Sequence, residues 1–230
     1  EILDRLMYCL APKDFKGKRV LVTAGPTREH IDPVRYISNP SSGRMGYAVA
    51  RAAEHRGADV VLVSGPANLK VPVNVEIIRT GSAKEMAAAV FDNMKKADII
   101  IKTAAVSDYR PSVTAKQKMK KGEGETTLLL RKTEDILLEL GKKKKNKILV
   151  GFAAETENLE KNAKEKLARK NLDIIAGNLL DGKSSGFGTD TNRVILFFRN
   201  GKKEILPLLE KESVAHILLD RILDLKAGKI

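Results

Sequence analysis

A polar segment between the first predicted strand and the first predicted helix has the residue types to bind an anion. It reads Asn39-Pro40-Ser41-Ser42-Gly43, where a dinucleotide-binding protein would carry its glycine fingerprint. Free backbone N–H groups and the positive dipole end favour an anion at such a helix start. An asparagine amide can both donate to an anionic oxygen and accept from an amine or hydroxyl. An ordinary helix N-cap would explain the two serines equally well.

A second polar segment, Lys102–Pro111 with the sequence KTAAVSDYRP, follows another predicted strand. Its small residues would let a ligand approach the backbone closely, and Asp108 would present a carboxylate beyond the end of the strand. Asp108 could bind a ribose hydroxyl, orient a metal ion or pair with Arg110. The segment therefore indicates a ligand site in which these three roles of Asp108 stay open.

Lysines recur in two further segments. Lys118 opens the sequence KMKK within the non-periodic stretch 116–125, which could close over phosphates and neutralise charge in a transition state. Exposed lysine-rich loops share that pattern. Lys166 and Lys170 lie four apart on one face of a predicted helix, where they could reach phosphates or stay solvated. Phe152 follows a buried strand and could stack on a base or pack in the core.

Composition and missing motifs exclude several classes of protein. The 230 residues carry a net charge of +13, which favours anionic partners. Aromatic residues make up only 4% and tryptophan is absent, so stacking on nucleic-acid bases is not expected to be the main function. There is neither a Walker motif nor zinc-ligand spacing. A nicotinamide-dependent oxidoreductase would need a glycine fingerprint after the first strand and an acidic residue after the second, and neither is present.

Apolar runs rich in valine and isoleucine alternate with helical patterns, which predicts a Rossmann-like, doubly wound and mostly parallel sheet with helices on both faces. The loops after its strands should converge at one edge. Ser82 and Glu85 have capping-box spacing. A C-terminal hairpin, with Asn200-Gly201 favouring a type I′ turn, and a final helix complete the fold. We predict strands over 19–25, 59–66, 75–81, 98–109, 147–155 and 172–178, helices over 41–58, 82–97, 158–171 and 211–225, a strand and helix within 126–141, a flexible loop over 184–192 and a hairpin over 193–208.

The chain is predicted to hold one main domain, residues 18–230, preceded by a helical tail or linker remnant, residues 1–17. Cys9 is the only cysteine and lies in an apolar segment, so we expect it to be buried, without a disulfide, in a cytoplasmic protein. No apolar run approaches the roughly 18 residues needed to span a bilayer, and no membrane partner is expected.

Taken in order, the segments TAGPTREHIDPVRYISNPSSGRMG, AAVSDYRP, KMKK, GFAAET and KNLDIIAGN resemble phosphopantothenate–cysteine ligase, a family whose members in most bacteria form the C-terminal half of a bifunctional coenzyme A biosynthesis protein. The resemblance runs from about Lys18 to the C-terminus. It implies that 4′-phosphopantothenate is joined to L-cysteine with CTP, through an acyl-cytidylate, with Mg²⁺ arriving on the triphosphate. It also implies a homodimer and a flavin-dependent phosphopantothenoylcysteine decarboxylase domain in the same full-length chain, absent from this sequence.

The resemblance also assigns residues. Asn39 matches an asparagine that acts on the acyl-cytidylate, and Lys118 matches a catalytic lysine of a mobile flap that also contacts CTP. The other positions that match CTP contacts are Lys102, Thr103, Ala104, Asp108, Glu134, Asp135, Ile136, Leu137, Phe152, Lys166 and Lys170. Those expected to bind phosphopantothenate are Arg35, Asn39, Ser41, Ser42, Gly43 and Ala105.

One departure affects the expected nucleotide site. Many relatives have Asn-Pro-Asp-Ile where this chain has Thr133-Glu134-Asp135-Ile136. A contact made through the backbone would survive that change, whereas one that depends on the shape of proline would alter base selectivity. CTP rather than ATP therefore rests on the resemblance alone.

Overall fold

The computed structural model confirms the predicted Rossmann-like sheet and describes residues 2–122, 124–155, 157–179 and 189–230. Eight strands lie in the order β12-β11-β10-β9-β6-β1-β4-β5, and all neighbouring pairs are parallel except β10–β11 and β11–β12. The strands of this sheet are β1 (Arg19–Ala24), β4 (Asp59–Ser64), β5 (Glu76–Arg79), β6 (Ile99–Lys102), β9 (Ile148–Glu155), β10 (Ile174–Leu179), β11 (Thr191–Phe198) and β12 (Lys203–Glu210).

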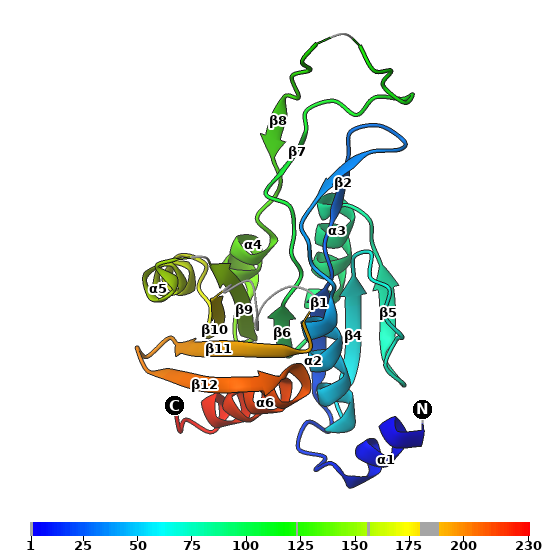
Figure 1. Ribbon diagram of the computed structural model, residues 1–230. Coiled ribbons are helices and arrows are strands. Elements are labelled where there is room, and N and C mark those ends of the chain that lie inside the picture. Colours follow the sequence, from blue (N-terminus) through cyan, green and yellow to red (C-terminus); the bar gives the residue numbers. More distant parts are fainter. Residues whose placement is uncertain (1, 123, 156, 180–188) are drawn as a thin grey trace.

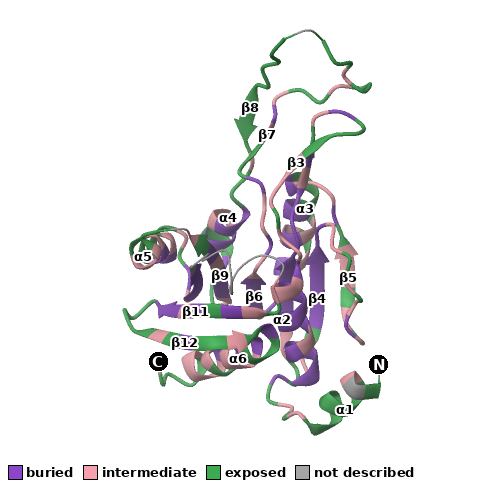
Figure 2. Ribbon diagram, in the orientation of Figure 1, coloured by how far each residue is buried: buried purple, intermediate pink, exposed green. Residues whose placement is uncertain are grey.

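Helices cover both faces of the sheet, as Figure 1 shows. Helices α2 (Arg44–His55) and α6 (Lys211–Lys226) pack against each other on one face, and α3 (Ala83–Met94), α4 (Ile136–Lys143) and α5 (Leu159–Arg169) cover the other. Each face has its own apolar cluster, and both clusters are dominated by aliphatic residues. The sheet is the buried layer between them, with the central strands coloured as buried in Figure 2.

Local sequence signals explain several element boundaries. Ser82 and Glu85 form the predicted capping box at the start of α3. Gly57, with φ of 85°, follows α2 in the left-handed conformation that ends many helices. The C-terminal hairpin is confirmed, but its predicted type I′ turn is wrong. That turn needs positive φ at both central residues, and of Asn200 and Gly201 only Gly201 has it. The N–H of Gly201 instead donates to the carbonyl of Phe198.

Two short antiparallel pairs lie outside the sheet and were not predicted as such. Strands β2 (Arg28–His30) and β3 (Tyr36–Ser38) form a hairpin in what was expected to be a turn and loop. Strands β7 (Tyr109–Pro111) and β8 (Leu130–Lys132) form the base of an arm, residues 109–132, whose described part projects beyond the body in Figure 1. Three-residue strands lack the length over which an apolar repeat shows in a sequence.

The N-terminal segment forms helix α1 (Ile2–Leu10), and the expected burial of Cys9 is wrong because the thiol is exposed. The apolar residues around Cys9 suggested a core that this helix does not have, since Ile2, Leu6 and Leu10 are exposed as well. Of the loop predicted over 184–192, residues 184–188 lie outside the described part, and Thr191 and Asn192 belong to β11. None of the helices in the described residues has the length and apolarity to span a bilayer.

Candidate active site

Asn39 ties the loop after β3 to the turn after β6. Its side-chain Nδ2 donates to the carbonyl oxygens of Ala105 and Val106, each at 3.2 Å. The turn is held from the other side by a bridge between Pro26 and Ala105 and by the Ala105 N–H, which donates to the Gly25 carbonyl at 2.9 Å. Because the donor side of the Asn39 amide is engaged with the protein, its oxygen is the atom that can accept from a ligand.

Helix α2 begins without a side-chain cap. Its N-cap is Gly43, in the left-handed conformation with φ of 81°, and neither Ser41 nor Ser42 caps the helix. The Ser41 hydroxyl instead accepts from the Gly43 N–H at 3.4 Å. This geometry rules out an ordinary serine N-cap and leaves the first-turn N–H groups for another partner.

Gly46 lets α2 lie directly on the sheet. A Cβ at this position would stand 2.4 Å from the Thr103 hydroxyl oxygen and 2.5 Å from the Ala24 Cβ. Only glycine permits this approach, which brings the helix N-terminus against the ends of β1 and β6. The third glycine of a dinucleotide fingerprint serves the same packing purpose.

The predicted convergence of strand-end loops is confirmed by a cavity of about 140 Å³, here called the α2 cavity. Its walls come from the start of α2, the turn after β6, the ends of β9 and β10, and the starts of β11 and α6. Seven predicted site residues line it: Ser41, Ser42, Gly43, Thr103, Ala104, Ala105 and Phe152.

The lining residues that were not predicted as site residues include three polar ones from β10, β11 and α6: Asn178, Asn192 and Lys211. Asn178 is 8% exposed and Asn192 is 4% exposed. Asn178 ends the motif KNLDIIAGN, so a polar residue closing a buried strand was the signal that pointed to it. No sequence pattern singled out Asn192 or Lys211, because their place depends on how β11 and α6 return to the sheet.

A second cavity of about 280 Å³, here called the α4 cavity, opens on the other side of the turn after β6. Five predicted residues line it: Lys102, Asp108, Glu134, Asp135 and Ile136. Asp135 caps α4, because its carboxylate accepts from the Leu138 N–H at 3.1 Å. The Lys170 ammonium lies 2.8 Å from the same carboxylate and links α5 to this cavity.

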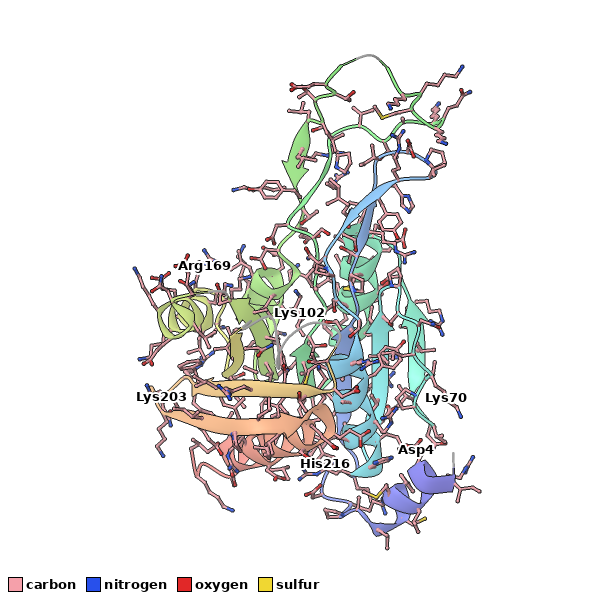
Figure 3. All side chains as sticks on the ribbon, in the orientation of Figure 1. Asp4, Lys70, Lys102, Arg169, Lys203 and His216 are labelled. Carbon is pink, nitrogen blue, oxygen red and sulfur yellow. The ribbon has the colours of Figure 1, made fainter. Side chains whose placement is uncertain are left out.

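Positive charge gathers around Lys102, which Figure 3 places near the middle of the molecule. Burial and the nearby Lys170 lower the pKa of Lys102 to about 8, and Lys166 adds to the effect while Asp135 and Asp108 oppose it. For Asp135, burial acts to raise the pKa, but the bonds from Lys170 and the Leu138 N–H lower it below its usual value. Lys166 pairs with Glu155. Three lysines therefore act on one small region.

Thr133, the first residue of the segment that departs from the family pattern, is hydrogen-bonded to the turn that separates the cavities. The Thr133 hydroxyl donates to the Ser107 carbonyl at 2.6 Å, and its N–H donates to the Asp108 carbonyl at 2.9 Å. The Thr133 side chain thus fixes the backbone beside Asp108, whereas a proline placed one residue later would restrict it through φ. Leu137 turns its side chain into the apolar cluster of the α3–α5 face, so only its backbone can serve the cavity.

Lys118 and Arg35 lie away from both cavities, at the contact between the arm and the β2–β3 hairpin. Arg35 pairs with the buried Asp32 at 2.5 Å and donates to the Met119 carbonyl at 2.7 Å. Burial acts to raise the pKa of Asp32, but bonds from Arg35 and from the Val34, Arg35 and Met119 N–H groups hold it well below its usual range. Lys118 itself is exposed. The structure therefore does not bring Lys118 together with Asn39 within one chain.

Comparisons with known proteins show the family of this chain. The model of the family described as DNA/pantothenate metabolism flavoprotein C-terminal domain matches residues 15–225. The coenzyme A biosynthesis bifunctional protein CoaBC of Bacillus subtilis (strain 168) is 51% identical over 209 residues, covering 90% of this chain and 52% of that protein. Its Escherichia coli (strain K12) counterpart is 44% identical over 226 residues, covering 96% and 55%. The chain thus spans about half the length of these relatives.

A solved structure agrees with the computed fold. The crystal structure of the C-terminal domain of a coenzyme A biosynthesis bifunctional protein CoaBC superposes with a TM-score of 0.80 at 42% identity. The match covers 93% of this chain and 98% of that one.

Proposed function

The chain belongs to the DNA/pantothenate metabolism flavoprotein C-terminal domain family, and from this premise we propose that it is a ligase that joins 4′-phosphopantothenate to L-cysteine with CTP. The products would be 4′-phosphopantothenoylcysteine, CMP and pyrophosphate. Coenzyme A biosynthesis, which the relatives' names state, is the pathway in which this reaction would stand.

One observation carries the proposal: the turn after β6 separates the α2 cavity, at a helix N-terminus, from the α4 cavity, which is lined by charged side chains. Thr103, Ala104 and Ala105 face the α2 cavity, whereas Lys102 and Asp108 face the α4 cavity. A carboxylate substrate and a nucleoside triphosphate must meet at one point while their other ends stay apart. On one side of this thin wall of small residues lies a hollow lined by Lys102 and Lys132, with Lys170 bonded to Asp135 at its edge, and on the other lies a helix N-terminus. This placement supports that arrangement.

In the first step, a carboxylate oxygen of phosphopantothenate would attack the α-phosphorus of CTP, and the bond from that phosphorus to pyrophosphate would break. Lys102, Lys166 and Lys170 would hold the triphosphate and offset the charge that grows on the leaving pyrophosphate. The acidic partners of Lys166 and Lys170, Glu155 and Asp135, keep these lysines in place before the nucleotide arrives.

In the second step, the L-cysteine amine would attack the acyl carbon, and the bond to the CMP oxygen would break as CMP leaves with that electron pair. Asn39 lines neither cavity but is bonded to the dividing turn through the carbonyls of Ala105 and Val106, and its amide oxygen would accept from the attacking amine. Ala105, whose carbonyl holds the Asn39 amide, would contact phosphopantothenate through its backbone.

The arm supports a homodimer as part of the proposal. Val113 and Leu129 on the arm are 80% and 74% exposed, and Tyr109 and Leu130 at its base are 47% and 41% exposed. A second copy would cover these apolar residues. Lys118 and Arg35, which lie on or against the arm, would then act on an active site through closure of the arm or from the partner chain.

Mg²⁺ fits the α4 cavity only as an ion carried by the nucleotide. The described residues contain no group of three or more His, Cys, Asp or Glu side chains that could hold a metal ion, although Asp108, Glu134 and Asp135 all line the hollow together with Lys102. Mg²⁺ is often bound through one or two carboxylates together with substrate phosphates. When bound it would withdraw charge from the phosphates, while Asp108 would orient the ion.

The remaining partners follow from the bifunctional relatives. We propose that the full-length protein also carries a flavin-dependent phosphopantothenoylcysteine decarboxylase, which would use the product of this ligase, and that both act in the cytoplasm. Their order follows from the chemistry, because the decarboxylase needs the cysteinyl carboxylate that amide formation leaves intact.

The test is a pyrophosphate-release assay with 4′-phosphopantothenate, L-cysteine and Mg²⁺, with CTP and ATP supplied in parallel. We expect release that requires phosphopantothenate and prefers CTP, with CMP formed in equal amount. Equal use of ATP would keep the ligase but reject CTP selectivity, and direct attention to Thr133–Ile136. No release with either nucleotide from folded protein would reject the ligase.

A further inference from the structure

Two asparagines place unpaired polar atoms at the inner end of the α2 cavity. Asn178 at the end of β10 and Asn192 at the start of β11 both line it, and both side chains are more than nine-tenths buried. The amide oxygen of each has no hydrogen-bond partner among the described residues. Such buried acceptors are costly unless a donor reaches them.

The first turn of α2 offers the complementary chemistry in the same cavity. Arg44, Met45 and Gly46 form this uncapped turn and line the cavity, and the Nδ2 of Asn192 donates to the Sδ of Met45 at 3.9 Å. The N–H groups of the turn and the positive end of the helix dipole favour a carboxylate or phosphate. The cavity therefore combines an anion-binding helix start with two hydrogen-bond acceptors.

The size and lining of the cavity limit what can bind. Its volume of about 140 Å³ lies well below the roughly 300–1,000 Å³ of pockets that enclose drug-sized ligands. Ala104, Ala153 and Phe152 add an apolar part to this lining. A triphosphate would be repelled by the amide oxygens and finds its counter-charges in the α4 cavity. A small zwitterion with a short apolar side chain matches all three parts.

We propose that this end of the α2 cavity is the subsite for the amino-acid substrate, with its carboxylate at the first turn of α2 and its amine at the side-chain oxygens of Asn178 and Asn192. The inference rests on the proposed ligase function and assigns a binding site to L-cysteine. The amine would stand on the α2 side of the dividing turn, to which the Asn39 side chain is bonded. From there its nitrogen can form the new bond to the acyl carbon as the bond to CMP breaks.

Lys211 at the start of α6 gives this subsite a positive edge. The side chain is 7% exposed, and its ammonium donates to the carbonyls of Thr189 and Thr191. Lys211 and Arg44 both line the cavity, and burial and then the charge of Arg44 lower the pKa of Lys211, while Asp190 opposes the effect. A cation there favours the neutral form of a neighbouring amine. Loss of one proton from the substrate ammonium to solvent makes the nitrogen nucleophilic, and a second proton leaves the nitrogen for solvent as the amide forms and CMP departs.

The experiment compares Asn178→Leu and Asn192→Leu with the matched variant Asn93→Leu, in which an asparagine of α3 on the other face of the sheet is changed. Each substitution at the subsite should raise the KM for L-cysteine by about 10- to 100-fold, the loss expected for a hydrogen bond to a charged group. Pyrophosphate release in a single turnover without cysteine should stay at the wild-type rate. That half-reaction also shows that each variant is folded. Asn93→Leu should change neither value.

Asn178→Asp and Asn192→Asp sharpen the assignment. A carboxylate keeps the acceptor and attracts an amine, so these variants should bind L-cysteine at least tenfold better than their leucine counterparts. Cysteamine lacks the carboxylate, so the wild type should show a higher KM for it than for L-cysteine. The KM for cysteamine should also be higher in Asn178→Leu than in Asn178→Asp, because only the aspartate can accept from the amine. Equal values in these two variants would place the amine elsewhere.

The outcomes separate this inference from the proposed function. Absence of pyrophosphate release from the wild type would reject the ligase itself. Release from the wild type, together with an unchanged cysteine KM in both leucine variants, would overturn the subsite alone. A rise in the KM for phosphopantothenate rather than cysteine would overturn it too, because the asparagines would then serve the pantothenate chain.

Discussion

The α2 cavity and the α4 cavity share one wall but bind by different physics. The α2 cavity presents helix N–H groups and two buried neutral amides, and Arg44 and Lys211 also line it. The α4 cavity is lined by lysines and carboxylates, namely Lys102, Lys132, Asp108, Glu134 and Asp135, and the charges of Lys166 and Lys170 act on Lys102. Neutral hydrogen bonds act only at contact and demand exact geometry. Charges act over several ångströms and are screened by salt. The α2 side is therefore suited to placing reacting atoms, and the α4 side to holding a polyanion.

Asn39 offers the largest expected effect, because it acts where the two cavities meet. Asn39→Ala should reduce amide formation by about 10²- to 10³-fold, the loss typical of a removed transition-state hydrogen bond. Activation by CTP should continue, so acyl-cytidylate should accumulate and be detectable by mass spectrometry after an acid quench. Normal amide formation in Asn39→Ala would contradict the assignment of the second step to Asn39 and the α2 cavity.

Lys118 tests whether the arm belongs to the α4 side of the comparison. Lys118→Ala should slow pyrophosphate release about 10²-fold, because a cation that offsets transition-state charge is lost. Little acyl-cytidylate should then be trapped, in contrast to Asn39→Ala. Lys120→Ala, two residues away on the same exposed segment, is the matched control and should keep at least half the activity.

Mixing the two inactive variants extends this test to the dimer. If Lys118 acts from the partner chain, an equimolar mixture of Asn39→Ala and Lys118→Ala subunits should recover up to about a quarter of the wild-type activity, because one kind of site in the mixed dimer carries both residues. If the arm closes within its own chain, the mixture should stay as inactive as its parts. Either result fixes how Lys118, which lies far from Asn39 in one chain, reaches the reaction.

The sequence predicted the sheet and the strand-end loops because long buried strands and amphipathic helices carry strong periodic signals. It also placed Thr103 and Lys102 in one segment, but it did not show that they face different cavities. Which cavity each of these residues lines depends on the conformation of the turn after β6. Pro26, Asn39 and Thr133, from distant parts of the chain, hold that turn in place. Asn192 was missed for a similar reason: its place is set by the return of β11 beside β10.

The charge of Lys102 should make CTP binding at the α4 cavity depend on pH. Its pKa of about 8 lies below the ordinary lysine value, so deprotonation removes its charge within a usable pH range. Only the protonated side chain attracts the triphosphate, and the apparent Kd for CTP should therefore rise with pH above 8, by up to about tenfold per unit. Below pH 8 it should be flat. Bound triphosphate favours the charged form, so the pKa of Lys102 should be higher in the CTP complex, and any bend that Lys102 causes in kcat should lie above pH 8.

Lys102→Arg is the control for this pH dependence. Arginine stays charged across the range, so the bend near pH 8 should disappear from a calorimetric titration of CTP. Lys102→Met should bind CTP weakly at every pH. A bend that persists in Lys102→Arg would assign it to another group and weaken the view that buried charge governs the α4 side.

Lys170 provides the smallest effect and the most direct contrast in salt dependence. Lys170→Met should raise the KM for CTP only about two- to fivefold, because Lys102 and Lys166 remain and partly exposed ion pairs contribute little. The change should shrink between about 50 and 300 mM salt, as screening weakens what Lys170 contributes. The KM for L-cysteine in the wild type should vary less over the same range, since the α2 cavity would bind it through short contacts with buried groups, and Lys211 beside them is itself 7% exposed. An equal response of the two KM values to salt would contradict the comparison. The two cavities would then not differ in how strongly charge contributes to binding, and the turn between them would only keep the two substrates apart.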